Sequence, residues 1–266
     1  MPDTKTLING VPETMLQTLY ARAKESQKEK HYIYDEKAIE IVSKLNYDFS
    51  LADKDKMMSN GVIARTIVLD NMVSDFLNKH NKVTVINIAC GLDTRCYRME
   101  GKYKYWYNID LPETISIRKK FLPESGPIYQ IAKSAMDESW VKDIFEATGT
   151  VLIIIEGLTM YLNEIDVKKI FQIINDSFKN VTVFVETMSP FVVKNVKEKS
   201  IDGSNAKFTW GVKNGKELES ILIGFKNIYD ISLTKGMEVF IPAYKIISKI
   251  LLIRNISNKI LVMENR

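Results

Sequence analysis

Residues 83–93 read VTVINIACGLD, a short apolar run that ends in a turn of small residues and an aspartate. The run has the length and the β-branched content of a strand that is buried on both faces. In an open parallel sheet, ligands bind outside the carboxyl ends of the strands, and small residues let ligand atoms approach the backbone closely. We therefore expect a ligand at the turn that contains Gly91.

Four more runs of this kind follow along the chain, separated by helical segments. Strands that alternate with helices imply right-handed crossovers and a mostly parallel sheet with both faces covered. Two later strands are expected near 225–233 and 259–263, so the predicted fold class is α/β, a Rossmann-like, doubly wound sheet of about seven mostly parallel strands. The four further runs are KYWYNID (104–110), PIYQIA (127–132), TVLIIIE (150–156) and VTVFVET (181–187).

The first 82 residues have a different pattern. Apolar residues recur there at three- to four-residue spacing, which predicts helices over about 11–23, 38–45 and 62–77, the last beginning at Gly61. We expect residues 1–82 to form a helical region that packs on a core of residues 83–266 and contributes to the active site. A charged insertion at about 188–210 is expected to act as a lid. Further helices are predicted to begin at Pro112 and at Glu164, and to span about 140–145, 216–222 and 243–252.

Composition excludes several classes of protein. No apolar stretch in the 266 residues approaches the roughly 18 needed to span a membrane, and the polar start MPDTKTLING does not resemble a secretory signal, so a cytoplasmic protein is expected. The net charge of +4 is spread over segments of mixed sign, and no nucleic-acid or membrane partner is predicted. The two cysteines are too few for a disulfide scaffold or a four-thiolate zinc site, and no metal is expected.

Acidic residues end or follow the second, third and fourth predicted strands, at Asp110, Asp137 and Glu156. Asp110 lies 19 residues beyond Gly91, where a carboxylate can accept hydrogen bonds from both hydroxyls of a ribose. A dinucleotide is disfavoured, because the glycine spacing that binds pyrophosphate is missing and Asp93 follows the turn at once. A cationic nucleoside without phosphate, such as S-adenosylmethionine, suits these carboxylates better.

Three segments carry a resemblance to a known family: VINIACGLDTRCYRM (85–99), YWYNIDLPETISIRKKFL (105–122) and IIIEGLTMYLNEIDVKKIF (153–171). Together they resemble the leucine carboxyl methyltransferase family, and in particular its bacterial branch of polyketide-synthesis (tetracenomycin-type) O-methyltransferases. The resemblance extends over about residues 11–187. It implies a class I methyltransferase fold and an enzyme that moves a methyl group from S-adenosylmethionine, leaving S-adenosylhomocysteine, to a carboxylate or phenol oxygen of a small molecule such as a polyketide-like metabolite.

The resemblance also implies roles for individual residues. Arg65 would hold the carboxylate of the methyl donor, Glu156 would bind its ammonium group, and Gly91 would line its methionine part. Asp110 would bind the ribose, and Asp137 would contact the adenine amine. Arg22, Ala89 and Leu111 complete the expected donor site. The chain departs from the family where Ala89-Cys90-Gly91 replaces Gly-Ala-Gly. If residue 89 needs a positive φ, alanine costs about 1 kcal/mol there and weakens donor affinity.

The acceptor side is less determined by the sequence. Tyr161 follows the fourth strand and His31 lies in the N-terminal region, so both are candidate catalytic residues, while Asp93 and Arg95 are expected to pair and support the turn. The N-terminal helices and the 188–210 insertion are expected to form the acceptor pocket. Methylation of a protein's terminal carboxylate, donor binding without turnover, and a nicotinamide-dependent oxidoreductase, which the missing glycines disfavour, remain as alternatives, and the oligomeric state stays open.

Overall fold

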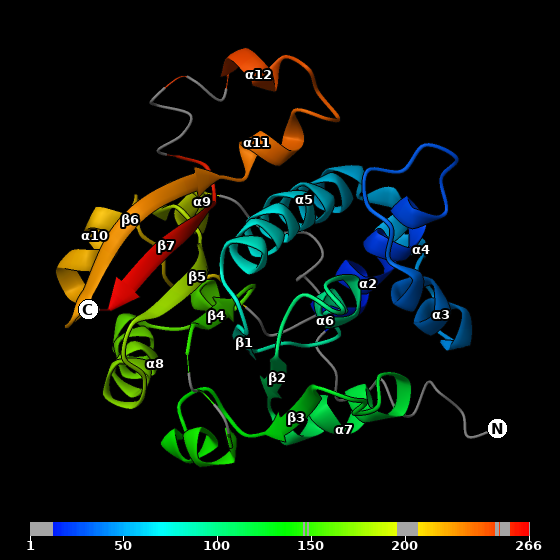
Figure 1. The fold of residues 1–266 in the computed structure, drawn as a ribbon. Helices are drawn as coiled ribbons and strands as arrows, with labels where there is room; N and C mark the ends of the chain where they lie inside the picture. The colour runs from blue at the N-terminus through cyan, green and yellow to red at the C-terminus, as the bar shows by residue number, and fades with distance from the viewer. Residues whose placement is uncertain are drawn as a thin grey trace.

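A seven-stranded sheet with the order β3-β2-β1-β4-β5-β7-β6 forms the centre of the protein (Figure 1). The computed structural model describes residues 13–145, 147, 149–195, 207–247, 250 and 256–265. Strands β1 to β5 are parallel, and β7 runs antiparallel between β5 and β6. The predicted fold class is therefore confirmed. The strands are β1 (Thr84–Ile88), β2 (Tyr105–Asp110), β3 (Ile128–Ala132), β4 (Val151–Ile155), β5 (Val181–Thr187), β6 (Phe225–Ser232) and β7 (Lys259–Asn265).

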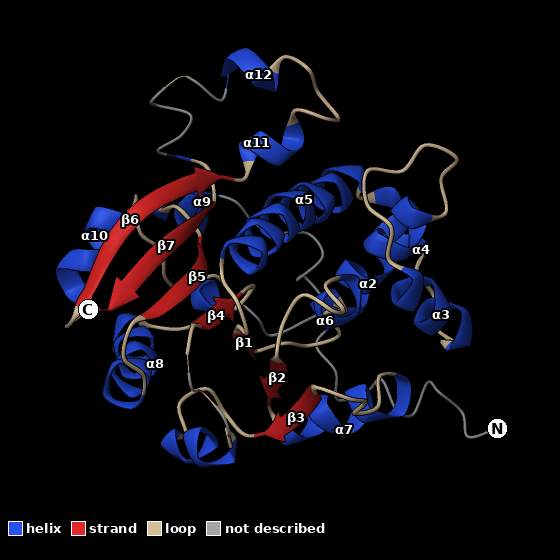
Figure 2. Ribbon diagram, in the orientation of Figure 1, coloured by secondary structure: helices blue, strands red, loops and turns tan. Residues whose placement is uncertain are grey.

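Both faces of the sheet are covered, which explains the unbroken apolar run of β4. Side chains alternate across a strand, so Ile153 packs in the core on one face and Leu152 and Ile154 pack in the core on the other. Helices α8 (Glu164–Ser177) and α10 (Gly215–Ile221) and the 3₁₀ helix η1 (Glu138–Asp143) cover the first face, and α5 (Lys56–Lys79) with α6 (Arg95–Arg98) covers the second (Figure 2).

Local signals fix several helix ends where the sequence places them. Pro112 opens α7 (Pro112–Phe121), and Asn163 caps α8, its side chain accepting a hydrogen bond from Asp166 N at 2.9 Å. The helix expected near 140–145 is the short 3₁₀ helix η1. In the region expected to be helical from 243 to 252, the structure describes α12 (Tyr244–Ile247), while residues 248–249 and 251–255 lie outside the described part of the chain.

The N-terminal region is helical, as expected, but its helix boundaries differ from the prediction. It contains α2 (Glu13–Ser26), α3 (Glu36–Lys44), α4 (Ser50–Lys54), which the sequence did not predict, and α5. The prediction that the third helix begins at Gly61 is wrong. Asp55 caps α5 by accepting a hydrogen bond from Met58 N at 2.9 Å, and the helix passes through Gly61.

The segments after β5 and β6 lie at the carboxyl end of the parallel strands. Helix α9 (Pro190–Asn195) opens the expected insertion, of which residues 196–206 lie outside the description. Helix α11 (Thr234–Met237), which was not predicted, follows β6 and packs on α5, as Figure 1 shows. Gly236 is required at this crossing, because a Cβ there would come within 2.1 Å of the main-chain oxygen of Ala64. No helix among the described residues combines the length and the apolar character that crossing a membrane requires.

Candidate functional site

The turn after β1 is joined to the end of β2 by Asp110. The Asp110 Oδ2 atom accepts a hydrogen bond from Gly91 N, and Oδ1 accepts one from Leu111 N, each at 2.7 Å. Ala89 and Gly91 both have positive φ, +55° and +48°. Burial raises the pKa of the Asp110 carboxyl above its usual range. Each carboxylate oxygen offers two lone-pair sites, so Asp110 can hold the turn and still accept hydrogen bonds from a ligand.

Two arginines hold the main chain of this turn from within the protein. Arg118 Nη1 donates to the carbonyl oxygens of Gly91 and Asp93 at 2.9 and 2.6 Å, and Arg22 Nη2 donates to Leu92 O at 2.9 Å. Sequence reasoning missed Arg118, which reads as an ordinary basic residue in the last turn of α7. The turn therefore keeps its shape through charge-assisted hydrogen bonds to its carbonyl oxygens.

At the strand ends, Arg65 lies between two carboxylates. Its Nε atom is 2.6 Å from Glu156 Oε1, and its Nη1 atom is 3.0 Å from Glu186 Oε2. Glu186 was not predicted, although it is the next-to-last residue of the strand segment VTVFVET and Glu156 is the last residue of TVLIIIE. The Glu186 side chain is 3% exposed, and burial together with the neighbouring Glu156 raises the pKa of its carboxyl. Gly157 N donates to Glu186 Oε2 at 2.8 Å.

From Glu156, alternating charges continue into the N-terminal region, and we call this series the charge ladder. Each member is within 3.0 Å of the next. In order, the members are Asp35, Arg98, Asp70, Arg95, Glu156, Arg65 and Glu186. The predicted pair of Asp93 and Arg95 is confirmed and branches from the ladder, with Arg95 Nη1 at 2.8 Å from Asp93 Oδ2.

Asp35, the first member of the charge ladder, connects α2 and α3 to the turn after β1. Asp35 is buried, caps α3 by accepting a hydrogen bond from Ala38 N at 3.0 Å, and pairs with Arg22 and Arg98. Burial acts to raise its pKa, but the two arginines and Thr94 bring the pKa below its usual value. The N-terminal helices are therefore joined to the sheet by ionic as well as apolar contacts.

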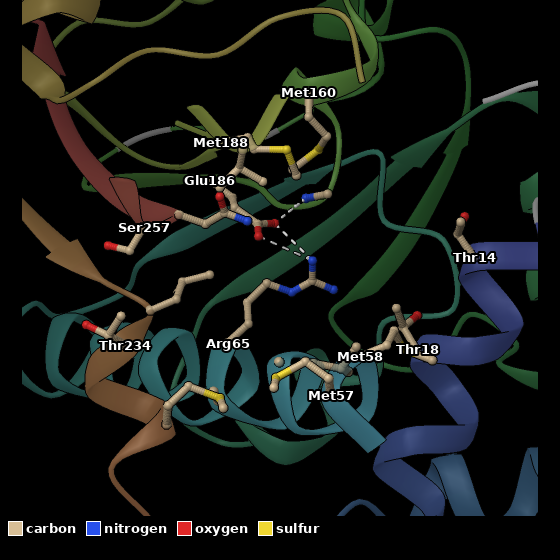
Figure 3. Close-up of a pocket in the computed structure, with 18 of the residues that line it drawn as sticks. Thr14, Thr18, Met57, Met58, Arg65, Met160, Glu186, Met188, Thr234 and Ser257 are labelled. Carbon is tan, nitrogen blue, oxygen red and sulfur yellow. Dashed lines mark hydrogen bonds and ion pairs between the residues drawn. The ribbon is translucent and has the colours of Figure 1, made fainter. Parts of the chain in front are cut away.

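A cavity of about 560 Å³ opens beside Arg65 and Glu186 (Figure 3). Five methionines give it a soft apolar lining, and Tyr161 lines it with its ring centroid 5.6 Å from that of Phe208. Its wall is formed by α2, α5, residues after β5 and the segment after β6, and the sequence did not predict the contribution of the last of these. The methionines are Met57, Met58, Met160, Met188 and Met237.

The remaining predicted site residues lie at different distances from this centre. Asp137 is exposed and caps η1, accepting a hydrogen bond from Ser139 N at 2.9 Å, and Leu111 is 51% exposed. Arg22 is buried, and all three of its guanidinium nitrogens donate hydrogen bonds within the protein. His31 is exposed, lies 3.2 Å from Lys28 O through Nδ1, and is not among the described residues that line the cavity. The described lining of the cavity therefore gives no support to a base role for His31, which stays a prediction.

The charged groups fit the methionine part of S-adenosylmethionine, which carries one carboxylate and one ammonium group. Arg65 and Glu156 offer the two opposite charges side by side, and no hydrogen bond or ion pair among the described residues uses Arg65 Nη2. The strand order reverses between β1 and β4, which is where ligands bind in open α/β sheets. This sheet and its strand-end site define a class I, S-adenosylmethionine-dependent methyltransferase.

Comparisons with known proteins agree with this class and give the family. The model of the leucine carboxyl methyltransferase family matches residues 15–175. The chain is 31% identical over 224 residues to the tetracenomycin polyketide synthesis O-methyltransferase TcmP of Streptomyces glaucescens, with 82% of each chain covered. The chain belongs to the leucine carboxyl methyltransferase family and is a methyltransferase that uses S-adenosylmethionine.

Two further similarities extend the comparison. The S-adenosyl-L-methionine-dependent methyltransferase dpfgK of Gibberella zeae is 29% identical over 244 residues, covering 84% of this chain and 82% of that one. Among solved structures, the magnesium protoporphyrin IX methyltransferase of Synechocystis with bound S-adenosylhomocysteine has a TM-score of 0.52 at 10% identity, covering 80% of this chain and 88% of that one. The second similarity supports the fold.

Proposed function

We propose that this enzyme transfers a methyl group to an oxygen atom, a carboxylate or a phenol, of a small and largely apolar molecule. The observation that carries the proposal is the cavity of about 560 Å³ with its five methionines, which begins at Arg65 and Glu186. Its volume is in the range of pockets that enclose small organic ligands. The name of TcmP describes an O-methyltransferase of polyketide synthesis, and this supports an oxygen acceptor of that kind.

The donor is proposed to lie along the ends of β1, β2 and β4. Arg65 would bind its carboxylate, Glu156 its ammonium group, and the turn with Ala89 and Gly91 would lie along its methionine part. These roles are supported by the opposite charges of Arg65 and Glu156 and by the absence of a side chain at Gly91, which lets a ligand approach the main chain.

The nucleoside part of the donor is proposed to extend toward β2 and β3. Asp110 would accept hydrogen bonds from the ribose hydroxyls, Leu111 would pack on the nucleoside, and Asp137 would accept one from the adenine amine. The exposure of Leu111 and Asp137 is compatible with a ligand on this side. Arg22 is proposed to act through Leu92 O, to which it donates a hydrogen bond at 2.9 Å, and so to position the turn.

When bound, the donor supplies an electrophilic methyl group on its sulfonium. The protein's contribution to such a transfer is orientation and the exclusion of water. The methionine-lined cavity provides an apolar wall for the acceptor, and Tyr161 would contact the acceptor near the reacting oxygen. A carboxylate acceptor is ionised at pH 7 and needs no base, whereas a phenol with a pKa near 10 gains from one.

The proposal is tested by offering methyl-labelled donor to the enzyme together with a cell extract. We expect label in the small-molecule fraction. If mild base then releases the label as methanol, the product is a methyl ester. If the label resists base, the product is an aryl methyl ether. Label only in a protein fraction would replace the proposal by methylation of a protein's terminal carboxylate, and no label in any fraction would contradict methyl transfer to both kinds of acceptor.

A further inference from the structure

Gly61 lies inside α5, where glycine is, apart from proline, the residue least favourable to a helix. A glycine is commonly required by a positive φ or by other atoms that come too close for a Cβ. Gly61 has neither reason, because its φ is not positive and a Cβ placed on it would meet no described atom beyond its own helix backbone within 4 Å. By contrast, a Cβ on Gly211, Gly215 or Gly236 would come within 2.3 Å of another part of the chain.

The bare position faces the cavity. On a helix, residues three and four positions apart lie on the same face. Gly61 lines the cavity itself, and so do all four of its neighbours at these spacings, which are Met57, Met58, Ala64 and Arg65. A side chain at position 61 would therefore project into the cavity, so the absence of one leaves space for a ligand and serves no packing within the described chain.

The place of Gly61 along the cavity indicates which ligand this is. Met57 lines the cavity and is 67% exposed, so the cavity reaches the surface of the protein there. Gly61 follows Met57 by one helical turn, and Arg65, the proposed partner of the donor carboxylate, follows Gly61 by another. The space at Gly61 thus lies between the proposed donor anchor and the surface, where the acceptor has to enter.

The opposite wall indicates the shape of the acceptor. Figure 3 shows Met160 and Met188 across the cavity from α5. Met160 belongs to the 3₁₀ helix η2 (Thr159–Tyr161), Met188 directly follows β5, and both are buried. Thioether sulfurs make favourable contacts with aromatic rings. Bare main chain on one side and thioethers on the other suit a flat ring.

We infer that Gly61 is a specificity-determining residue, because a ring of the methyl acceptor lies against the main chain of α5 at this position. The inference rests on the proposed function and specifies its substrate class: the oxygen that receives the methyl group is carried by a flat ring and not by a flexible chain. A side chain at position 61 would occupy the space of the ring, while donor binding would be unaffected.

The test uses calorimetry in the presence of saturating S-adenosylhomocysteine to measure the binding of two carboxylic acids that differ in shape. One is 2-naphthoic acid, a flat ring system, and the other is octanoic acid, a flexible chain. Gly61→Ala should weaken the binding of 2-naphthoic acid roughly five- to tenfold, as one methyl group forced into a filled space does. Octanoic acid can bend away from the methyl group and should lose little affinity. Gly61→Leu should abolish measurable binding of 2-naphthoic acid.

Asn60→Ala is the matched control. Asn60 is the preceding residue of α5 and is not among the described residues that line the cavity, so its replacement should leave the binding of both acids unchanged. Both Gly61 variants should have a Tm at or above that of the unaltered enzyme, because alanine and leucine favour a helix more than glycine does. Their Kd for S-adenosylhomocysteine should equal that of the unaltered enzyme.

The outcomes separate this inference from the function on which it rests. Four results would overturn it: no binding of 2-naphthoic acid by the unaltered enzyme, an equal loss of both acids in Gly61→Ala, unchanged binding of 2-naphthoic acid in Gly61→Leu, or a lowered Tm or weakened S-adenosylhomocysteine binding in Gly61→Ala. Failure of the proposed function is seen instead in the labelled-methyl experiment, which uses the unaltered enzyme and does not depend on residue 61.

Discussion

Replacing Ala89 by glycine should stabilise the protein, although glycine usually destabilises a fold. Ala89 has a φ of +55°, in the left-handed region where a side chain with a Cβ is strained. The strain costs an L-residue about 1–2 kcal/mol. Glycine removes this cost but raises the conformational entropy of the unfolded chain, which lowers the free energy of unfolding by about 0.4–1 kcal/mol. The net gain in the free energy of unfolding is therefore about 0.5–1 kcal/mol.

The gain should appear as a shift of about 1–4 °C in Tm, because a protein of this size shifts by about 2–4 °C per kcal/mol. Chemical denaturation gives the free energy directly, and calorimetry gives donor affinity. Ala89 has its positive φ in the folded chain without a bound donor. We therefore expect the strain to lower the stability of the fold, and the Kd for the donor to differ less than twofold between Ala89→Gly and the unaltered enzyme. The several-fold weakening of affinity that the sequence suggests would then not be observed.

Lys82→Gly is the matched control. Lys82 also has a φ of +55° and is exposed in the turn before β1, so its replacement should give a similar gain without any effect at the donor site. If Ala89→Gly instead lowers stability by 0.5–1 kcal/mol, as glycine does at an ordinary position, the positive φ of residue 89 is not a property of the folded protein and the reasoning is refuted.

Three further predictions concern carboxylates of the site. Asp110→Ala should raise the donor Kd about 30-fold, through two lost charge-assisted hydrogen bonds, and an unaltered calorimetric titration would show that Asp110 serves only the turn. Asp35→Ala should lower the free energy of unfolding by about 3–5 kcal/mol at pH 7, since Arg22 and Arg98 lose a buried partner. The pKa of the Asp35 carboxyl is lowered in the folded protein, so the ionised carboxylate stabilises the fold above pH 3.8, its ordinary pKa. This stabilisation is lost as the pH falls through the pKa of the folded state, and the difference in unfolding free energy between the variant and the unaltered protein should narrow there. A difference that does not change with pH would contradict the ionic role. Glu186→Gln should show the opposite pH dependence, because the pKa of Glu186 is raised in the folded protein and its ionisation therefore destabilises the fold. The unfolding free energy of the variant relative to that of the unaltered enzyme should increase as the pH rises above 4.5, the ordinary pKa of the group. A difference between the two denaturation curves that does not change with pH would count against this prediction.

The sheet was predictable because its strands are short apolar runs with clear ends. Each of the five parallel strands lies within the run predicted for it, since continuous burial on two faces leaves a strong signal in the sequence. Helix α4 and helix α11 were not predicted, because helices of five and four residues have too few turns to show a period. The start of α5 was misplaced because Gly61 was taken as a boundary, although the cap lies at Asp55.

The donor side of the site was more predictable than the acceptor side for a physical reason. Asp110 ends β2 and Glu156 directly follows β4, and the carboxyl ends of parallel strands lie at one edge, so sequence position alone predicts that both lie at that edge. The cavity proposed for the acceptor is formed by side chains from α2, α5 and the segments around β6 and β7, which are distant in the sequence. Glu186 lies one residue before the end of β5, and the same argument applied to that strand would have found it.

The position of Glu186 explains why the site suits a positively charged donor. Glu156 is paired with both Arg65 and Arg95, whereas the described ion pair of Glu186 is with Arg65. Burial is the main cause of the raised pKa of Glu186, and the neighbouring Glu156 adds to it. S-adenosylmethionine carries a net charge of +1, and its product after methyl transfer carries none. In the proposed donor position, the Glu186 carboxylate would therefore stabilise the positively charged donor more than the uncharged product.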